Sequence, residues 1–410
     1  MATTNNYTGA AWNGSFKEYN PGFYLAPAIT ENRLVEAGLV KLMTDVSGKI
    51  QFPSLVVNPQ YGDIQTTYSS QGSFTRNLTQ IDPVTIAVNL DLDKSVLIKT
   101  WEAAQLRPDY NPIEAPDDLT SAVLMIAGQQ ISADMQQLAI AGKTSRPDIY
   151  TFTQSFTGFV PYAISNCLPA QNIKVTPTAA SAIATASGVT TVTVADSSSL
   201  NPGDYITFDS ITASGVTFNG LNPVGRSYIV AAVPSSTTFT IYDPVYGAIT
   251  QSAAATGATF AFINYSNFQL AVAQIIRSIP IAVRGKQDQI RIVIPQHIVD
   301  SYRLTQSFAR SRNSSYGDFS LNLGEVDAYT FNAMGFTFEV VPTAPPNTMI
   351  AYIPDNLVYS TNTNVNGPAG PTLRIIDMSM SNGDNVLRLI AQFAFGVQFG
   401  FINEVTVVSC

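Results

Sequence analysis

Charged residues are scarce in this 410-residue chain, at 12% of the sequence against about a quarter in a typical soluble domain. Hydrophobic residues make up 45% and aromatic residues 10%, which excludes a disordered, highly charged chain. The centres of protein interfaces are depleted in charge and enriched in Tyr and Phe. The composition therefore favours a subunit of an assembly. A Ser/Thr-rich extracellular β-protein is the alternative that composition leaves open.

Positive charge is the scarcer of the two signs. The chain has 21 Lys and Arg against 29 Asp and Glu, which gives a net charge of -8. No stretch of the sequence concentrates the basic residues. Because nucleic-acid binding relies on clustered cations that contact phosphates, the sequence argues against a sequence-specific nucleic-acid-binding protein.

Histidine and cysteine are almost absent, which limits the chemistry of the chain. His297 is the only histidine, so a catalytic triad would depend on it, and no Gly-x-Ser-x-Gly motif or complete phosphate-binding loop motif accompanies it. Cys167 and Cys410 have no metal-type spacing, and we expect two free thiols. We therefore expect a structural His297, no enzyme activity, and no catalytic, cofactor-binding or metal site.

Three carboxylates raise the question of a metal ion. Asp91 and Asp93 alternate with apolar residues in the segment 84–93, so they share one face of a strand, and Asp82 lies near them in sequence. Carboxylate oxygens are the ligands that hard cations prefer. Surface carboxylates without a metal are much more common, and we expect no metal here.

Long apolar runs and leader sequences are also missing. The first eight residues have neither a basic nor an apolar region, so we expect no signal peptide and no large propeptide. The most apolar stretch, Val386–Ile402, contains Arg388 and two glutamines and is too short and polar to span a bilayer. We expect a soluble protein, made in a cytoplasm, without a membrane segment.

The first third of the chain predicts an arm, a hairpin and a long helix. Residues 1–50 are polar up to Pro27 and then predict one amphipathic helix over Ile29–Met43. Residues 51–93 predict a hairpin with a polar tip at Tyr68–Phe74 and a return strand at Val84–Asp93, which alternates strictly. A hairpin of this length is poorly stable alone, so it needs a surface to lie on.

The helix predicted over Asp117–Ala141 is the strongest in the chain. Asp117 and Asp118 complement its N-terminal dipole, and Gly142 follows it as a stop signal. About 25 residues at 1.5 Å each give a helix close to 40 Å long. Its apolar stripe consists of Leu119, Val123, Ile126, Ala127, Ile131, Met135, Leu138 and Ala141.

The remainder of the chain alternates between β-rich and α/β segments. Residues 172–262 contain short β-rich runs and very little charge, which predicts a small all-β sandwich or barrel inserted as one piece. A helix capped by Ser266, a buried strand at Ile290–Ile294 and a helix opening at Pro295 are expected next. The last quarter predicts strands at 335–341 and 349–353, then a hairpin over Val386–Phe401 that leads into 403–408.

This order of elements resembles the HK97-type major capsid proteins of tailed double-stranded DNA bacteriophages. The resemblance is carried by the helix ending in Ile140-Ala-Gly-Lys143, by Met334-Gly335 before a strand, by the Pro-rich turn Pro342–Pro346, and by Asn385–Arg388 at the start of the final hairpin. It implies an α+β fold. The implied parts are an N-terminal arm (1–50), an E-loop hairpin (51–93), a peripheral domain (94–165) with a spine helix (117–142), a linker (166–171), an inserted immunoglobulin-like β domain (172–262), an axial domain (263–370) and returning peripheral strands (371–410).

The resemblance also implies a function. It implies hexamers and pentamers of this chain that form an icosahedral shell around packaged double-stranded DNA, in a virion head assembled in the cytoplasm of a bacterial host. Partners would be other copies of the chain, portal and scaffolding proteins, cement or head-fibre proteins, and packaged DNA by non-specific proximity. Some members crosslink an E-loop lysine to a neighbour's asparagine, but residues 51–93 contain no lysine and only Arg76 as a basic residue, so we expect no such crosslink.

Five residues are candidates for assembly contacts. Tyr68, Phe74 and Arg76 belong to the predicted hairpin, and Arg310 and Arg312 flank a predicted loop, for which a solvated surface is the alternative. Two other functions remain open at this point. One is an encapsulin-type shell around cargo enzymes, and the other is a β-rich phage tail or adhesin protein in which residues 172–262 would bind the target.

Overall fold

The computed structural model is a mixed α+β protein, as predicted, and it separates into two compact units. The first unit comprises residues 1–139, 152–156 and 355–400, and the second comprises 140–151, 157–354 and 401–410. The structure describes residues 16–18, 27, 29–30, 32–46, 48–58, 73–93, 117–145, 157–212, 215–264, 266–300, 330–333, 335–365, 370–378 and 386–410.

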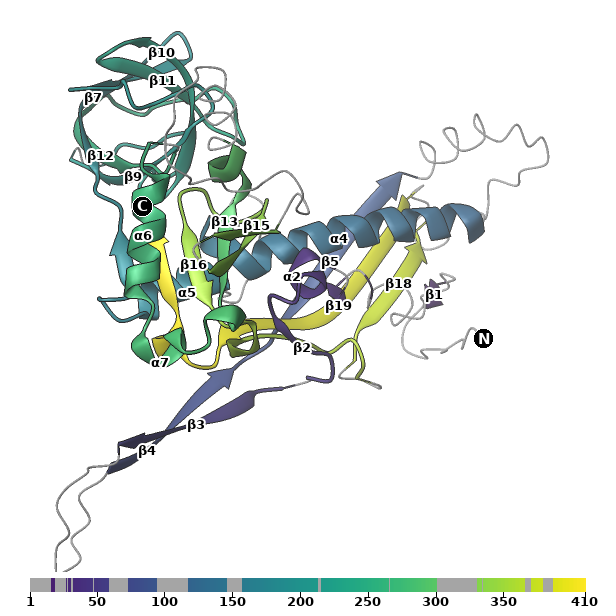
Figure 1. The fold of residues 1–410 in the computed structure, drawn as a ribbon. Coiled ribbons are helices and arrows are strands. Elements are labelled where there is room, and N and C mark those ends of the chain that lie inside the picture. Colours follow the sequence, from purple (N-terminus) through teal and green to yellow (C-terminus); the bar gives the residue numbers. More distant parts are fainter. Residues whose placement is uncertain are drawn as a thin grey trace, which may run out of the picture. The chain divides into compact units, whose positions relative to one another are not determined.

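The sheet of the first unit is built around one long strand, β19 (Val386–Phe399), which is yellow in Figure 1. Phe395 pairs with both Val84 of β5 (Val84–Asp93) and Thr361 of β17 (Leu357–Thr361), so β5 and β17 lie on opposite edges of β19. β18 (Thr372–Asp377) pairs with the first half of β19. β1 (Phe16–Glu18) extends the sheet beside β18, and β2 (Lys41–Met43) extends it beside β17.

β19 corrects the prediction of a hairpin over 386–401. The strand continues through Gly396 without turning, and its pairing with β17 extends to Phe399. A Cβ atom at position 396 would lie 2.9 Å from the Ser360 hydroxyl and 3.2 Å from Pro83 Cα. Gly396 is therefore needed for close packing within a sheet, a role that glycine takes in strands as well as in turns.

The helix predicted over 29–43 is also shorter than expected. α2 covers only Arg33–Glu36, where Asn32 accepts hydrogen bonds from the backbone amides of Leu34 and Val35. Gly38 adopts a φ of 62°, which ends the helix, and the chain then enters β2. Two apolar residues of the predicted helix, Leu34 and Leu39, are fully inaccessible to solvent, and Val35 and Leu42 are half-buried.

The long helix forms as α4 (Asp117–Ser145), with a break in its helical geometry at Gly142. Ala127, Ile131, Met135, Leu138 and Ala141 of the predicted stripe are buried. Ile126 is 68% exposed instead, and Leu124 is buried. The inward face is therefore rotated slightly at its N-terminal end relative to the prediction.

Two glycines meet where α4 ends. Gly142 has a φ of 66°, and a Cβ atom there would lie 2.3 Å from the backbone nitrogen of Gly158. Gly158 precedes α5 (Phe159–Asn166), and its own Cβ would lie 2.5 Å from the Gly142 nitrogen. Neither contact leaves room for a side chain, so the backbone of α4 touches the start of α5 directly.

The second unit contains a six-stranded sheet with helices on both faces. The strands run in the order β14 (Thr330–Ala333), β15 (Phe336–Val341), β13 (Arg291–Pro295), β16 (Met349–Tyr352), β20 (Thr406–Ser409) and β6 (Asn172–Lys174). Side chains of α6 (Phe268–Ser278) and α7 (Ile281–Arg284) share a core with Ala351 of β16. The neighbouring Tyr352 points to the other face, where its ring lies 6.1 Å from that of Phe159 in α5.

The remaining elements are a helix that begins after β13 and three short 3-10 turns. A helix begins at Gln296, directly after Pro295, as predicted. Asn267, and not Ser266, precedes α6, because the Ser266 hydroxyl bonds the Asn264 side chain. Short 3-10 turns lie at η1 (Gln287–Gln289), η2 (Pro354–Asn356) and η3 (Ile402–Glu404).

The predicted all-β segment forms a closed barrel of six strands (Figure 1). The strands are β7 (Thr178–Ala186), β8 (Val189–Val194), β9 (Tyr205–Ile211), β10 (Ser227–Ser235), β11 (Thr238–Tyr242) and β12 (Ala255–Ala261). β9 pairs with both β10 and β12, which closes the barrel, whereas an immunoglobulin-like domain has two separate sheets. The immunoglobulin-like description is therefore not confirmed. Outside the barrel, β6 pairs with β20.

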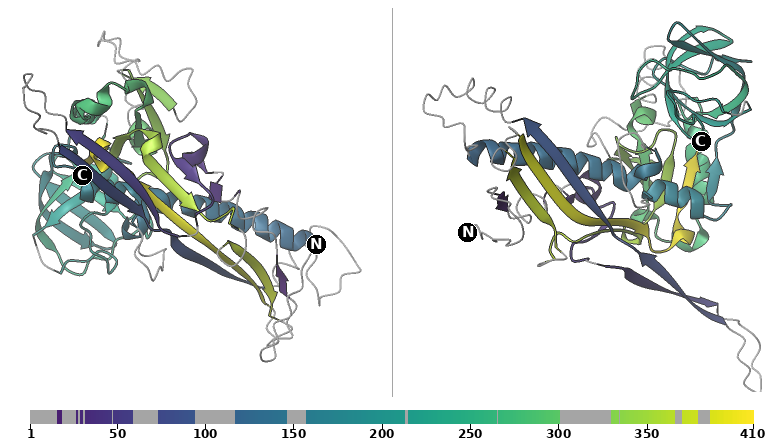
Figure 2. Two further views of the ribbon diagram at one scale, coloured as in Figure 1. Left: turned by 90° about the horizontal axis from the view of Figure 1, so that it is seen from below. Right: turned by 180° about the vertical axis from the view of Figure 1, so that it is seen from behind.

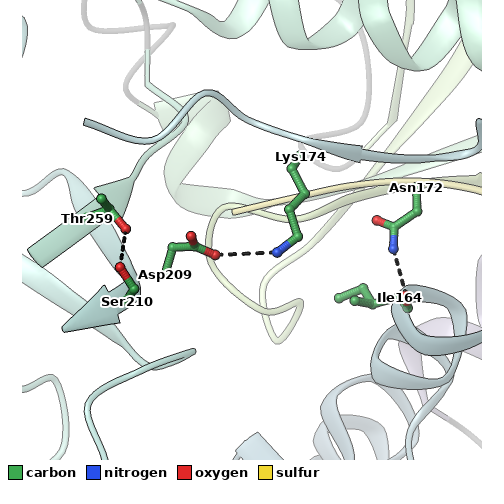
Figure 3. Close-up of polar contacts among 6 residues, drawn as sticks. All are labelled: Ile164, Asn172, Lys174, Asp209, Ser210 and Thr259. Carbon is green, nitrogen blue, oxygen red and sulfur yellow. Dashed lines mark hydrogen bonds and ion pairs between the residues drawn. The ribbon is translucent and has the colours of Figure 1, made fainter. Parts of the chain in front are cut away.

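Buried polar side chains fix the barrel to the neighbouring sheet. Asn347, fully buried and with a φ of 58°, donates to the Tyr205 carbonyl (2.9 Å) and the Thr207 hydroxyl (3.1 Å) of β9 and accepts from the Ile263 amide (2.9 Å). Figure 3 shows two polar contacts of β6, of which only the exposed Lys174–Asp209 pair reaches the barrel. Asn172 donates to the Ile164 carbonyl of α5 at 2.7 Å, and Lys174 pairs with Asp209 of β9 at 3.4 Å.

Substituting Asn347 with alanine is expected to loosen the barrel. The change removes the hydrogen bonds of Asn347 with Tyr205, Thr207, Ile263 and His297, and it leaves the half-buried Tyr205 carbonyl and the buried Ile263 amide unsatisfied, at a cost of about 1–3 kcal/mol for each group. Asn219→Ala is the matched control, because Asn219 also has a positive φ (52°) but makes one side-chain bond at an exposed position. We expect hydrogen exchange in β9 and β12 to accelerate at least tenfold in Asn347→Ala only. Equal protection in the two variants would contradict this role.

Candidate assembly surface

A two-stranded ribbon of β3 (Ile50–Asn58) and β4 (Ser73–Ile81) is the principal candidate surface (Figure 2). Nine residue pairs join the strands, from Ile50 opposite Ile81 to Asn58 opposite Ser73. This corrects the predicted hairpin, whose return strand was placed at 84–93. That segment is β5, and it pairs along its whole length with β19.

β5 explains the error in the hairpin prediction. Its strict alternation indicates a strand with one covered face, and such a strand fits the central sheet better than an isolated ribbon. On the predicted apolar face, Ile86 is buried, Val84 and Val88 are half-buried, and Leu90 is 39% exposed. The less regular segment 73–81 supplies the return strand.

The base of the ribbon is anchored to the first unit. Ile81 is 1% exposed, and the Thr79 hydroxyl donates to the Gly400 carbonyl at 2.8 Å. Lys49 and Asp82 form an ion pair of 2.9 Å beside this base, with both side chains more than half exposed. Exposed pairs of this kind contribute little to stability, so packing at Ile81 is the main attachment.

Beyond its base the ribbon lacks a covering layer in the part of the chain that the structure describes. β3 and β4 pair only with each other, and Leu78 is 54% exposed. Pro53 lies opposite Leu78, and a proline without an N–H group is typical of an edge strand. Two-stranded sheets are marginally stable in water, and open strand edges readily pair with another chain.

The structure places two of the five predicted assembly residues. Phe74 lies in β4 opposite Val57, and Arg76 lies two residues further on, exposed and opposite Leu55. Tyr68, Arg310 and Arg312 lie outside the described residues. Leu78 was missed, because an apolar residue in an alternating pattern resembles a core position.

Two of the three carboxylates considered as metal ligands, Asp91 and Asp82, are engaged by cations. Both Asp91 oxygens accept hydrogen bonds of 2.7 Å from Arg388, its cross-strand partner in β19. The Arg388 guanidinium holds the pKa of Asp91 below its usual range. Asp82 pairs with Lys49. Across the described ranges, no three His, Cys, Asp or Glu side chains are grouped in a way that would hold a metal ion.

His297 lies at the contact between the barrel and the neighbouring sheet. Its ring is 4.5 Å from that of Tyr205, and its Nε2 atom is buried without a hydrogen-bond partner. Burial lowers the pKa of His297 to about 4, and a hydrogen bond with Asn347 opposes part of this shift. These contacts agree with the expected structural role.

Acid is expected to destabilise this contact through His297. The folded protein keeps the ring neutral down to about pH 4, whereas the unfolded chain takes up the proton near pH 6.5. Stability is therefore complete above pH 6.5 and falls between pH 6.5 and 4, by up to about 3 kcal/mol. The pH dependence of unfolding by urea measures this. His297→Gln should flatten the curve in that window, and an unchanged curve would contradict the assignment.

The two cysteines are free and partly buried. Burial raises the pKa of Cys167 to about 11 and raises that of Cys410 as well. The Cys167 thiol also lies 3.5 Å from the Val405 carbonyl. Both thiols are therefore protonated and weakly nucleophilic at neutral pH.

None of the helices in the described ranges is both long enough and apolar enough to cross a membrane. α4, the longest of them, has polar residues along its exposed face, including Gln129 and Gln130.

Comparisons with known proteins give structural similarities only. No family model matches the chain, and no curated protein does. Among solved structures, the chain is similar to one from Mycobacterium phage Ogopogo (11% identity, 99% of this chain and 96% of that chain, TM-score 0.46). It is also similar to a chain of the satellite phage P4 procapsid that includes the size determination (Sid) protein (9%, 94% and 89%, 0.45), and to the capsid of Myoviridae phage XM1 (10%, 100% and 95%, 0.44).

Proposed function

We propose that this chain is an HK97-like major capsid protein of a tailed bacteriophage, which assembles into hexamers and pentamers of an icosahedral shell around double-stranded DNA. One observation carries the proposal. The β3–β4 ribbon has open edges and the exposed Leu78, and the packing on the first unit that the structure describes lies at the base of the ribbon. An element of this kind gains stability when a neighbouring copy covers it.

The order of the other elements supports the same assignment. We assign β3–β4 to the E-loop, α4 to the spine helix, and the sheet around β19 to the peripheral domain. The six-stranded sheet of the second unit is assigned to the axial domain, with the barrel as its insertion. β20 pairs with β16, so we place the last strand with the axial domain and not with the peripheral strands first expected over 371–410.

The proposal includes a location and partners. The protein acts as a structural subunit of the virion head, without enzyme activity, and is assembled in the cytoplasm of the bacterial host. Its first partner is another copy of itself, and portal, scaffolding, and cement or head-fibre proteins are further partners. The net charge of -8 suits a wall that lies close to packaged DNA without binding it tightly.

Electron microscopy of the purified, concentrated protein tests the proposal. Closed shells, or rings of five and six copies, are the expected particles. Monomers or fibres at high concentration would contradict it. An encapsulin-type shell would enclose proteins and no DNA, so nuclease protection of DNA in particles from infected cells separates the two shell functions.

A further inference from the structure

The β-barrel and the neighbouring six-stranded sheet have separate hydrophobic cores. The barrel core consists of buried side chains between Ala180 and Phe262, and the core of the sheet begins at Ile263. Among the described residues, no side chain belongs to both cores. Since a domain with its own core can stay folded when its contacts with a neighbour open, the barrel is a module that can move as a body.

The contact between the barrel and the sheet, which we call the joint, runs along strand β9. Tyr205, Thr207 and Asp209 occupy alternate positions of β9 and lie on the outer face of the barrel, because the residues between them are buried in its core. Their partners outside the barrel are, in this order, His297, Asn347 and Lys174. The contacts of this one face can break while the pairing between the barrel strands persists.

His297 is a side chain of the joint that cannot take up a proton without disturbing it. Its ring lies 4.5 Å from that of Tyr205, and its Nε2 atom is buried without a hydrogen-bond partner. A protonated imidazole has an N–H donor on each nitrogen atom. Protonation would therefore leave a charged donor without an acceptor in a site shielded from water, which is costly. The ring takes up a proton readily only when the contact with Tyr205 opens to water.

The ionisable groups on the adjoining elements are neutral or bonded to other partners. The turn that carries Asn347 contains no charged residue between Pro342 and Thr348. Burial raises the pKa of Tyr205, so its phenol stays neutral. The bonded pairs are Asp209 with Lys174 (3.4 Å, Figure 3), Asp204 with Asn264 (2.8 Å) and Asp300 with Gln296 (2.8 Å). Burial is accordingly the main cause of the low pKa of His297.

We propose that the joint is an acid-sensitive hinge: a proton on His297 opens the contact with β9, and the barrel, still folded, moves away from the sheet. The docked form keeps the ring neutral down to about pH 4, whereas an open joint lets it titrate near pH 6.5. Docking is therefore complete above pH 6.5 and weakens as the pH falls toward 4. The hinge lies within one copy of the chain, so it does not depend on the proposed function.

Hydrogen exchange at single amides tests the hinge. The Ile263 amide donates to the Asn347 side chain across the joint at 2.9 Å, so it reports on docking. Its opening equilibrium constant should rise about 20-fold between pH 7 and pH 5, after correction for the intrinsic pH dependence of exchange. Amides of β8 and β11 in the barrel and of β13 in the sheet should keep their protection. An equal rise in these strands would reveal unfolding and would overturn the hinge.

Substitutions identify the group that takes up the proton. His297→Gln removes the titrating ring, so the Ile263 amide should open equally often at pH 7 and pH 5. Asp209→Asn is the matched control, because Asp209 is an ionisable side chain of β9 with a partner across the same joint. The control should keep the 20-fold rise, which is about the value expected for the unmodified chain. A rise that persists in His297→Gln, or one that disappears in Asp209→Asn, would contradict the role of His297.

A direct titration keeps the test decisive for the unmodified chain. His297 is the only histidine, so a sample labelled with carbon-13 at histidine gives one ring signal in nuclear magnetic resonance. That signal should titrate well below pH 6.5, because the docked joint excludes the proton. A midpoint at pH 6.5 or above would show a ring already open to water, and the hinge would then have no proton-sensitive element.

Discussion

Alanine at position 142 is expected to lower the unfolding temperature of the second unit by more than 10 °C or to prevent soluble expression. The φ of 66° disfavours any residue with a Cβ atom by about 1–2 kcal/mol. The new Cβ would also lie 2.3 Å from the Gly158 nitrogen, so α4 and α5 would have to separate. Overpacking against backbone costs more than overpacking against a side chain that can rotate, and we expect a total loss above about 4 kcal/mol.

Two other glycine variants separate the cost of the positive φ from the cost of the steric contact. Gly38→Ala has nearly the same φ (62°) with open space around its Cβ, so it reports backbone strain alone. Gly158→Ala has an ordinary φ but places a Cβ 2.5 Å from the Gly142 nitrogen, so it reports the steric contact alone. Thermal unfolding followed by circular dichroism should rank Gly142→Ala as the most damaging and Gly38→Ala as the mildest. A Gly38→Ala loss as large as that of Gly142→Ala would show that the α4–α5 contact is unimportant.

Removal of the β3–β4 ribbon is expected to abolish closed shells while the rest of the protein folds. Residues 51–80 can be replaced by a two-residue Asn-Gly turn, because Ile50 and Ile81 are directly paired. The buried Ile81 remains in place, so the unfolding temperature should change by only a few degrees. Electron microscopy should then show separate rings or smaller oligomers, with shells reduced at least a hundredfold.

A point substitution tests the same surface without removing residues from the chain. Leu78→Asp keeps the ribbon and its register but places a charge where a neighbouring copy would bury an apolar side chain. We expect normal folding and weaker assembly. Shells of normal yield from the deletion variant would refute the E-loop assignment of β3 and β4.

Local patterns were sufficient to predict the types of most elements. The apolar stripe of 117–141 predicts α4, and the alternation of 84–93 predicts a strand, because helix and strand periodicities depend on neighbours in sequence. The sequence did not show which strands pair with one another. β5 joins β19 across almost 300 positions, and nothing in residues 84–93 distinguishes that pairing from a hairpin with 51–58.

Two errors in the predicted secondary structure involve glycine residues. A hairpin was predicted over Val386–Phe401, but Gly396 lies within one continuous strand, where Ser360 and Pro83 approach its backbone. Gly38 was included in a helix, although its positive φ ends that helix. A sequence does not reveal whether a glycine is present for its backbone freedom or for its small size, since both depend on the surrounding fold.

The sequence predicted that the candidate site is a ribbon, but it did not predict which residues form the second strand. A ribbon with a polar tip followed from residues 51–93, but the return strand was placed about ten residues too late. Phe74 was therefore expected at the tip, and it lies in β4 together with Arg76. Ile281 and Phe401 could not be predicted as exposed, because they are residues of the kind that fills cores and only the fold shows their exposure.

The closure of the barrel has a consequence for engineering. Thr178 at its beginning pairs with Phe260 near its end, so the chain leaves the neighbouring sheet and returns to it at nearly the same point. A foreign domain with adjacent termini fits the same gap, and each particle would then display many copies of a chosen enzyme or antigen. Such a graft must also replace Asn347, whose side chain would otherwise lose its acceptors on β9.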